Sequence, residues 1–288
     1  MSGGPDSLAL LLLAHHALPD QVEAATVDHG LRETSADEAA MVASICADLG
    51  IPHSTLSVEV APGNLQAKAR AARYAALEAW LAGRGLDALA TAHHADDQAE
   101  TLLMRLNRAS GAAGLAGVRA RGNAPGGAVL VRPLFGWRKR ELEEICKAAH
   151  LSPAVDPSNV DDRFDRTRVR AALATADWLD AGALAKSAAH LSDADEALDW
   201  AAAREWDECV EEAEGTIRYA PSAPLAIRLR VLARAIASLG GEPRGTAVAQ
   251  LERDLRHGRG GNVAGVLARS LGESWELRRE PPRAPLKG

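Results

Sequence analysis

The spacing of apolar residues in the first half of the chain alternates between a strand-like and a helical period. Strands are predicted at residues 22–28, 56–60, 86–92 and 129–134. Helices are predicted before and between them, at residues 6–16, 35–49, 65–82, 95–108 and 139–149. Strands that alternate with helices form parallel βαβ units. The pattern therefore predicts an α/β fold with a doubly wound, mostly parallel sheet.

The strand pattern weakens after about residue 170. Residues 171–210 are rich in Ala, Leu, Asp and Glu and are predicted to be helical, as are residues 225–239, while residues 262–279 are predicted to form a small hairpin. A chain of 288 residues is long enough for two domains. We therefore expect an α/β domain over residues 1–170 and a smaller, mainly helical domain over residues 171–288.

A glycine-rich turn, Ser2-Gly3-Gly4-Pro5-Asp6-Ser7, opens the first predicted helix. Glycines let backbone N–H groups approach an anion, and a helix N-terminus adds partial positive charge. The serine hydroxyls can donate to phosphate oxygens, and Asp6 can hold a metal ion. On composition alone an ordinary turn with a helix cap is an equal alternative. Such a turn normally follows a strand, so we expect the first strand of the domain to be missing from this chain.

Charge and cysteine content narrow the functional classes. The chain has 33 Lys and Arg against 39 Asp and Glu, a net charge of −6, and 47% hydrophobic residues, which excludes a disordered chain. We predict no membrane span and no signal peptide. The three scattered cysteines form no CxxC pair, so a reducing cytoplasmic location is expected. Those cysteines are Cys46, Cys146 and Cys209.

The net charge is distributed unevenly along the chain. Residues 217–288 hold 13 Lys and Arg against 6 Asp and Glu, and residues 119–170 hold 11 against 7, while residues 177–216 hold 2 against 12. The two basic segments could bind a polyanion, although solvated helix faces are the commoner explanation.

Trp178, Trp200 and Trp206 lie among acidic helical residues, where we expect core packing rather than base stacking.

Candidate catalytic residues lie where predicted strands end, which is where open α/β sheets bind ligands. Asp28 ends one strand, and the segment from His93 to Glu100 follows another. Asp97 and Glu100 are three residues apart and share a helix face, so they can bind Mg²⁺ or an ammonium group. Helix capping is the structural alternative, and it leaves the pair His93-His94 unexplained.

The glycine-rich turn resembles the SGGxDS pyrophosphate loop of the N-type ATP pyrophosphatases. Further motifs follow along the chain: Val27-Asp28-His29-Gly30-Leu31-Arg32, Asn64-Leu65-Gln66-Ala67, Ala69-Arg70-Ala71-Ala72-Arg73-Tyr74, Thr91 to Thr101, Gly111-Ala112-Ala113-Gly114-Leu115, Arg132-Pro133-Leu134, Asp156-Pro157-Ser158-Asn159 and Arg163 to Arg170. Together with the glycine-rich turn, these motifs make residues 2–170 resemble the tRNA(Ile)-lysidine synthases.

The resemblance implies a specific ligase. It implies that ATP adenylates the C2 oxygen of the first anticodon cytidine in tRNA(Ile) with anticodon CAU, and that L-lysine then displaces AMP to give lysidine. ATP and Mg²⁺ are the implied cofactors, with no DNA or membrane partner. ATP would lie at Ser2, Gly3, Gly4, Pro5, Asp6, Ser7 and His93, with Mg²⁺ at Asp6. Asp28, Asp97 and Glu100 would handle lysine, and Arg73 the activated nucleotide.

Two other functions remain open on the sequence. A tRNA thiolase of the same superfamily activates a base in the same way, but such enzymes usually need a reactive cysteine pair or an iron–sulfur cluster. A catalytically inactive tRNA-binding remnant is the second alternative, because the first strand is absent. Pyrophosphate release distinguishes an enzyme from a remnant, and lysine dependence distinguishes it from a thiolase.

Overall fold

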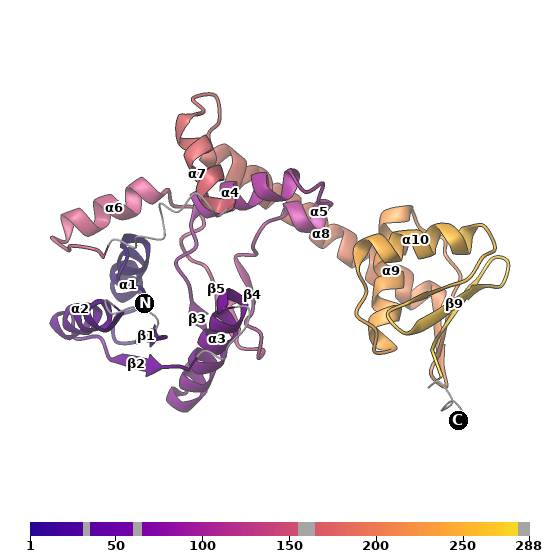
Figure 1. The fold of residues 1–288 in the computed structure, drawn as a ribbon, viewed down its shortest axis with the longest axis horizontal. Helices are drawn as coiled ribbons and strands as arrows, with labels where there is room; N and C mark the ends of the chain where they lie inside the picture. Colours follow the sequence, from indigo (N-terminus) through magenta and orange to yellow (C-terminus); the bar gives the residue numbers. More distant parts are fainter. Residues whose placement is uncertain (31–34, 60–64, 155–164, 282–288) are drawn as a thin grey trace. The chain divides into compact units, whose positions relative to one another are not determined.

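The computed structural model describes residues 1–30, 35–59, 65–154 and 165–281 (Figure 1). Packing divides the chain into two compact units, Met1–Ser192 and Asp193–Gly288. Several sequence motifs lie partly or wholly outside the described residues: Leu31-Arg32, Asn64, Asp156-Pro157-Ser158-Asn159 and Arg163-Phe164.

The first unit is an α/β domain, as predicted. Strand β1 (Ala24–Asp28) pairs in parallel with β2 (His53–Ser57). Strand β3 (Leu89–Ala90) pairs in parallel with β5 (Val129–Val131), and β5 pairs antiparallel with β4 (Arg121–Asn123). The second predicted strand begins three residues earlier than expected, because the chain turns into it directly after the buried Ile51 and the exposed Pro52.

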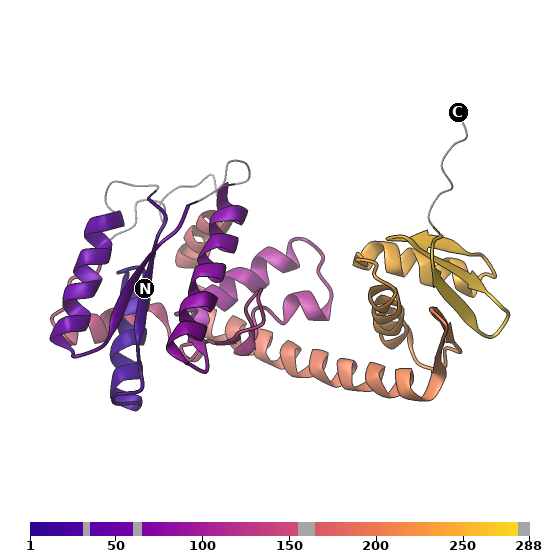
Figure 2. The same ribbon diagram turned by 90° about the horizontal axis from the view of Figure 1, so that it is seen from below.

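Helices surround these strands. Helix α2 packs against β1 and β2, and α3 packs against β1 and β3 (Figure 2). Helix α1 packs on α6 through a cluster that includes Leu8, Leu142 and Cys146, so burial of Cys146 is explained by packing. The helices of this unit are α1 (Pro5–Ala17), α2 (Ser35–Asp48), α3 (Leu65–Arg84), α4 (Ala95–Leu106), α5 (Ala112–Leu115), α6 (Lys139–Ala148) and α7 (Asp165–Thr175).

The long helix predicted over residues 171–210 is interrupted. Helix α7 ends at Thr175, and α8 (Ala181–Cys209) starts after Asp180, whose Oδ1 accepts the Ala183 N–H at 2.6 Å as a helix cap. The division between the two units lies inside α8 rather than at the composition shift near residue 170, because α7 packs against α4 of the first unit.

The second unit contains a five-stranded antiparallel sheet in the order β6-β7-β10-β9-β8. The predicted hairpin is confirmed, whereas β6, β7 and α10 were not predicted. The acidic run of β6 carries no alternating apolar pattern that would indicate a strand. The elements are β6 (Val210–Ala213), β7 (Thr216–Tyr219), α9 (Leu225–Ser238), α10 (Gly245–Arg256), β8 (Gly261–Val263), β9 (Val266–Ser270) and β10 (Trp275–Arg279).

One hydrophobic core joins the sheet and helices of the second unit. Tyr219, Leu232, Ile236, Leu255 and Leu277 are its most deeply buried side chains. Helices still form the larger part of the regular structure here.

The three tryptophans behave differently from one another. Trp206 is buried in the core of the second unit, as expected. Core packing was the wrong prediction for Trp178 and Trp200, which are 79% and 64% exposed. Trp200 instead lies beneath the Arg204 guanidinium, 5.3 Å from its ring centre. Among the described residues no helix is both long and apolar enough to cross a bilayer.

Candidate active site

The glycine-rich turn is held in shape by its own serines. The Ser7 hydroxyl donates a hydrogen bond to the Gly4 carbonyl at 3.0 Å. The same hydroxyl oxygen accepts a hydrogen bond from the Ser2 backbone N–H at 3.3 Å. Gly3 has a φ of +73°, a conformation that side chains disfavour. A Cβ on Gly3 would also lie 2.8 Å from Met41 Cε. The sequence therefore folds into one defined loop at the start of α1.

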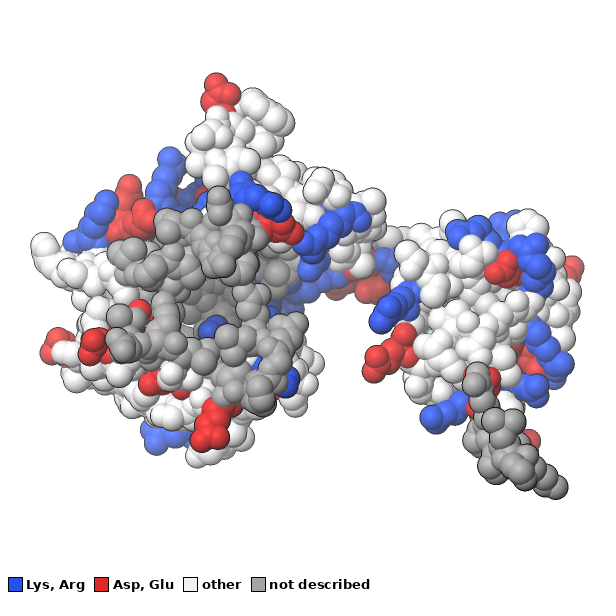
Figure 3. All heavy atoms as spheres, in the orientation of Figure 1, with Lys and Arg blue, Asp and Glu red and all other residues white. Residues whose placement is uncertain are grey.

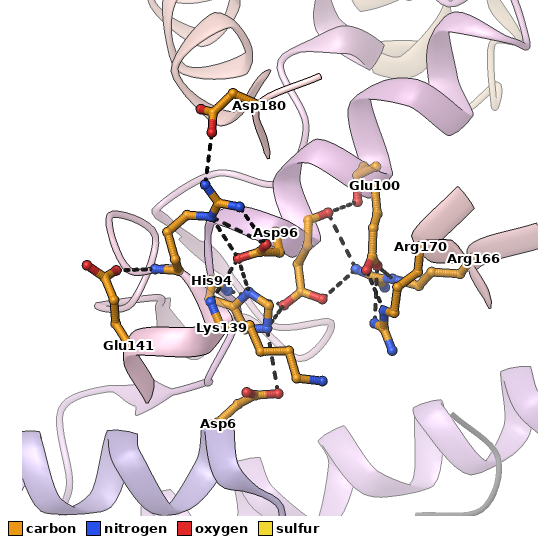
Figure 4. A network of polar contacts seen from close by, with 12 residues as sticks. Asp6, His94, Asp96, Glu100, Lys139, Glu141, Arg166, Arg170 and Asp180 are labelled. Carbon is orange, nitrogen blue, oxygen red and sulfur yellow. Dashed lines mark hydrogen bonds and ion pairs between the residues drawn. The ribbon is translucent and has the colours of Figure 1, made fainter. Parts of the chain in front are cut away.

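His94 connects this loop to the start of α4. Its buried imidazole Nε2 lies 3.6 Å from Asp6 Oδ2 and 3.5 Å from Asp97 Oδ2, while Nδ1 lies 3.6 Å from Asp96 Oδ2 (Figure 4). Burial alone would lower the pKa of His94, but Asp6, Asp96 and Asp97 outweigh it and raise the pKa to about 9. The ring is therefore an imidazolium at neutral pH, surrounded by three carboxylates.

This charge makes stability depend on pH. The folded pKa of His94 lies above its ordinary value of 6.5, so its stabilising effect is complete below pH 6.5 and is lost as the pH rises through about 9. We expect the free energy of unfolding in EDTA to fall by about 2 to 3 kcal/mol over this range. Denaturant unfolding of the wild type and of His94→Gln at several pH values measures it. An equal fall in both proteins would assign the pH dependence elsewhere.

Asp96 fastens α4 to the start of α6. Its carboxylate accepts the Lys139 backbone N–H at 2.8 Å and the Arg138 guanidinium at 3.2 to 3.3 Å. Burial tends to raise the pKa of Asp96, but His94, Arg138 and the Lys139 N–H hold it well below its ordinary value. Arg138 also reaches Asp180 at 3.2 Å. These bonds hold Asp96 between the two helices. Asp97 caps α4 by accepting the His94 backbone N–H at 3.1 Å, and it also lines the cavity described below.

Asp97 and Glu100 are brought together, as their spacing predicted, but two arginines of α7 hold them. Arg166 lies 2.9 Å from Asp97 Oδ1 and 2.6 Å from Glu100 Oε2. Arg170 lies 2.6 Å from Glu100 Oε1. Glu100 is only 2% exposed, so these guanidiniums compensate a buried charge. Sequence reasoning gave neither arginine a role in the site, although their four-residue spacing places them on one helix face.

A cavity of about 270 Å³ lies beside Asp97. Its wall combines cations, an acid, a histidine and apolar side chains from α3, from the end of β3 and from α4. Burial is the main cause that lowers the pKa of His93, so this imidazole is neutral at pH 7, and its Nδ1 lies 3.1 Å from Thr91 Oγ1. The lining residues are Arg70, Arg73, Tyr74, Leu77, Thr91, Ala92, His93 and Asp97.

Asp28 lies near this cavity but does not line it. Its Oδ1 accepts the Gly30 N–H at 2.9 Å at the end of β1. The next residue, His29, contacts the Arg73 guanidinium at 3.3 Å. Arg73 therefore links the end of β1 to the cavity. Among the predicted residues, the structure brings Asp6 and Asp97 together through His94, and His93, Arg73 and Asp97 around the cavity.

The described residues contain no group of three acids, histidines or cysteines that could hold a metal ion by themselves. Mg²⁺ does not need such a group, because it is usually bound by one or two carboxylates together with substrate phosphates. Asp6 fits that arrangement. Its Oδ1 is buried without a hydrogen-bond partner among the described residues, and it lies in the turn that opens α1.

Comparisons with known proteins agree with this geometry. Residues 1–176 match the PP-loop domain family. A tRNA(Ile)-lysidine synthase of Novosphingobium aromaticivorans is 47% identical over 98% of this chain and 88% of its own length. One from Zymomonas mobilis is 39% identical over the same shares. The U34-tRNA thiolase NcsA of Methanococcus maripaludis, with its [4Fe-4S] cluster, has a TM-score of 0.55, with 18% identity over 67% of this chain and 69% of that one, which shows the fold alone.

Proposed function

Because the chain belongs to the tRNA(Ile)-lysidine synthase family, we propose that it joins L-lysine to C2 of the first anticodon cytidine of tRNA(Ile) with anticodon CAU. ATP adenylates the C2 oxygen and releases pyrophosphate, and lysine then displaces AMP. The product, lysidine, changes the codon read by the tRNA from AUG to AUA. One observation carries the proposal: His94 joins Asp6 of the phosphate loop to Asp97 of the acid pair.

Each half of this reaction has its own residues. The backbone N–H groups and serine hydroxyls of residues 2–7 receive the ATP phosphates. Asp6 would hold Mg²⁺, which when bound would supply positive charge against the phosphates. The His94 imidazolium lies beside the same loop and compensates part of the negative charge of Asp6, Asp96 and Asp97, so it positions Asp6. Arg73 contacts the activated nucleotide, because its planar fork suits phosphate. The neutral His93 borders the same cavity and orients the nucleotide.

Lysine must enter as an ammonium and react as an amine, because an ammonium has no lone pair. Asp97 lines the cavity, so its carboxylate binds the ammonium and accepts the proton. Glu100 supports Asp97 indirectly, because Arg166 bonds to both carboxylates. Asp28 lies at the end of β1, one residue before the His29 that contacts Arg73, and we assign it to lysine binding with Asp97.

Mass analysis of the cytidine nucleoside tests the function directly. Incubation of tRNA(Ile) with the protein, ATP and L-lysine should convert one cytidine to lysidine. Reactions without ATP and without lysine are the controls. An unchanged cytidine in the complete reaction, with tRNA bound, would favour the inactive remnant. Transfer of sulfur in place of lysine would favour the thiolase.

The cysteines argue against the thiolase. Cys46 and Cys146 are buried, and burial raises the pKa of both thiols, which makes them poor nucleophiles. They belong to separate hydrophobic clusters, and Cys209 belongs to the second unit. Within the described residues they form no cluster site.

Replacing Glu100 separates the two half-reactions. Glu100→Gln removes the charge that fixes Arg166, so we expect about a tenfold loss in the lysine step, the effect of one weakened charged hydrogen bond. Pyrophosphate release without lysine should change less. Single-turnover measurements of adenylated tRNA and of lysidine give both rates. Glu143→Gln, on α6, is the control. Equal losses in the two half-reactions would assign Glu100 to the ATP site instead.

We also propose that residues 171–288 bind tRNA while residues 1–170 carry catalysis, in the cytoplasm where tRNA and ATP are found. Figure 3 shows basic side chains in blue, interspersed with acidic ones in red, on the visible face of the second unit. A cavity of about 270 Å³ in this unit carries arginines on its wall, and Arg256 there has no carboxylate partner among the described residues. Its lining residues are Leu225, Arg228, Glu252, Arg253, Arg256 and His257.

A further inference from the structure

The cavity beside Asp97 carries positive charge that the described residues do not neutralise. Arg70 and Arg73 are three residues apart on α3, so both reach the cavity from one helix face. The Arg70 guanidinium lies 5.0 Å from the centre of the Tyr74 ring. Neither arginine pairs with a carboxylate among the described residues. In contrast, Arg166 at the other side of Asp97 is fully engaged by two acids.

The same cavity also offers a carboxylate and an apolar surface. Asp97 contributes the acid from α4, while Tyr74 and Leu77 of α3 and Ala92 after β3 contribute apolar contacts. Cations, an apolar surface and one acid together suit a molecule that carries a carboxylate, an aliphatic chain and an ammonium group. An amino acid with a long basic side chain has these three parts.

A phosphate is the competing anion for this positive charge. The phosphate loop, residues 2–7, does not contribute to the described wall of this cavity. ATP phosphates have their own N–H donors in that loop, and the proposed function assigns Arg73, whose guanidinium already contacts His29 at 3.3 Å, to the activated nucleotide. Arg70, one turn earlier on α3, has no such contact, and its guanidinium is left for a different anion.

We propose that Arg70 binds the α-carboxylate of L-lysine and so selects a free amino acid as the nucleophile, while Asp97 holds the amine that reacts. This inference rests on the proposed function. Stacking on Tyr74 holds the Arg70 guanidinium at the cavity without consuming its N–H donors, which remain available for a carboxylate. The reaction at C2 does not involve the α-carboxylate, so Arg70 acts on lysine binding rather than on the chemical step.

The test compares L-lysine with lysinamide, in which the carboxylate is replaced by a neutral amide. We expect Arg70→Ala to raise KM for lysine about tenfold, since a hydrogen bond to a charged group is lost, with kcat nearly unchanged. KM for lysinamide should stay as in the wild type. Arg70→Lys should recover part of the preference for lysine. Arg84→Ala is the matched control, because this arginine of α3 is paired with Glu23 at 2.7 Å.

Other outcomes would overturn the inference in distinguishable ways. An equal rise of KM for both compounds would show that Arg70 does not contact the carboxylate. Loss of pyrophosphate release in the absence of lysine would place Arg70 at the nucleotide. No lysine-dependent product from the wild type would overturn the proposed function itself, and this inference with it. Circular dichroism confirms that each variant is folded.

Discussion

Asp6→Ala should lower ATP-dependent pyrophosphate release by at least about a thousandfold, because a metal ion contributes several kcal/mol to phosphoryl chemistry and each 1.4 kcal/mol is a factor of ten. Asp6 fits Mg²⁺ through a buried oxygen that has no hydrogen-bond partner among the described residues. Asp6→Asn keeps the shape of the side chain and removes its charge, so it should lose nearly as much. Pyrophosphate release with saturating tRNA and ATP measures the effect.

The fold should survive both substitutions. Asp6 contributes little packing, and His94 keeps Asp96 and Asp97 as partners. Asp48→Ala, an exposed acid on α2, is the matched control and should retain normal turnover. Circular dichroism and thermal melting follow the folded state. A folded Asp6→Ala protein with wild-type pyrophosphate release would remove Asp6 from the metal site.

Replacing Arg253 and Arg256 together by alanine should weaken tRNA binding about a hundredfold at low salt, because each charged contact to a phosphate contributes about 1.5 kcal/mol. Both arginines are exposed on α10 beside the cavity of the second unit. Two lost phosphate contacts release fewer counterions, so the slope of log K against log salt should decrease by about 1.5. Fluorescence titration of labelled tRNA over a salt series gives both quantities.

The control for this experiment is Arg259→Ala, because Arg259 is already neutralised by Asp254 at 2.6 Å. Deleting residues 240–288 would be a less selective test, since Leu251, Leu255 and Leu277 belong to the core of this unit. If the double variant bound tRNA with unchanged affinity and salt slope, these arginines would be a solvated surface. The basic segment at residues 119–170 would then be the candidate docking surface.

The parts of the candidate site that could be predicted from the sequence are those formed by residues close together in the chain. The glycine turn and the pair Asp97 and Glu100 are set by neighbours within a few residues, so spacing makes them candidates, and the family resemblance favours a functional role over an ordinary turn and a helix cap. The charge of His94 depends on Asp6, which lies far away in sequence. Arg166 and Arg170 lie 66 and 70 residues after Glu100 in the sequence. The spacing of residues within a single helix cannot predict a contact between two helices that are so far apart in the chain.

The same reasoning applies to the fold. Strand β5 is a continuous apolar run and β1 is mostly apolar before Asp28, and their positions were predicted to within a few residues. The acidic sequence of β6 resembles the end of a helix. The segment forms a strand because it pairs with β7 through backbone hydrogen bonds. The hydrogen bonds to β7 stabilise the strand more than the local helix propensity of these residues opposes it. The pattern of residues 210–213 alone carries no information about that partner.

The conformation of Gly3 limits which residues can replace it in the phosphate loop during evolution. Two separate barriers oppose a side chain at this position, and they differ in how easily a second substitution removes them. The close approach to Met41 involves the flexible end of a long side chain, so a smaller residue at position 41 would relieve it. The φ of +73° belongs to the backbone itself and no neighbour can relieve it. Compensating mutations therefore leave glycine in place, with asparagine as the least unfavourable replacement.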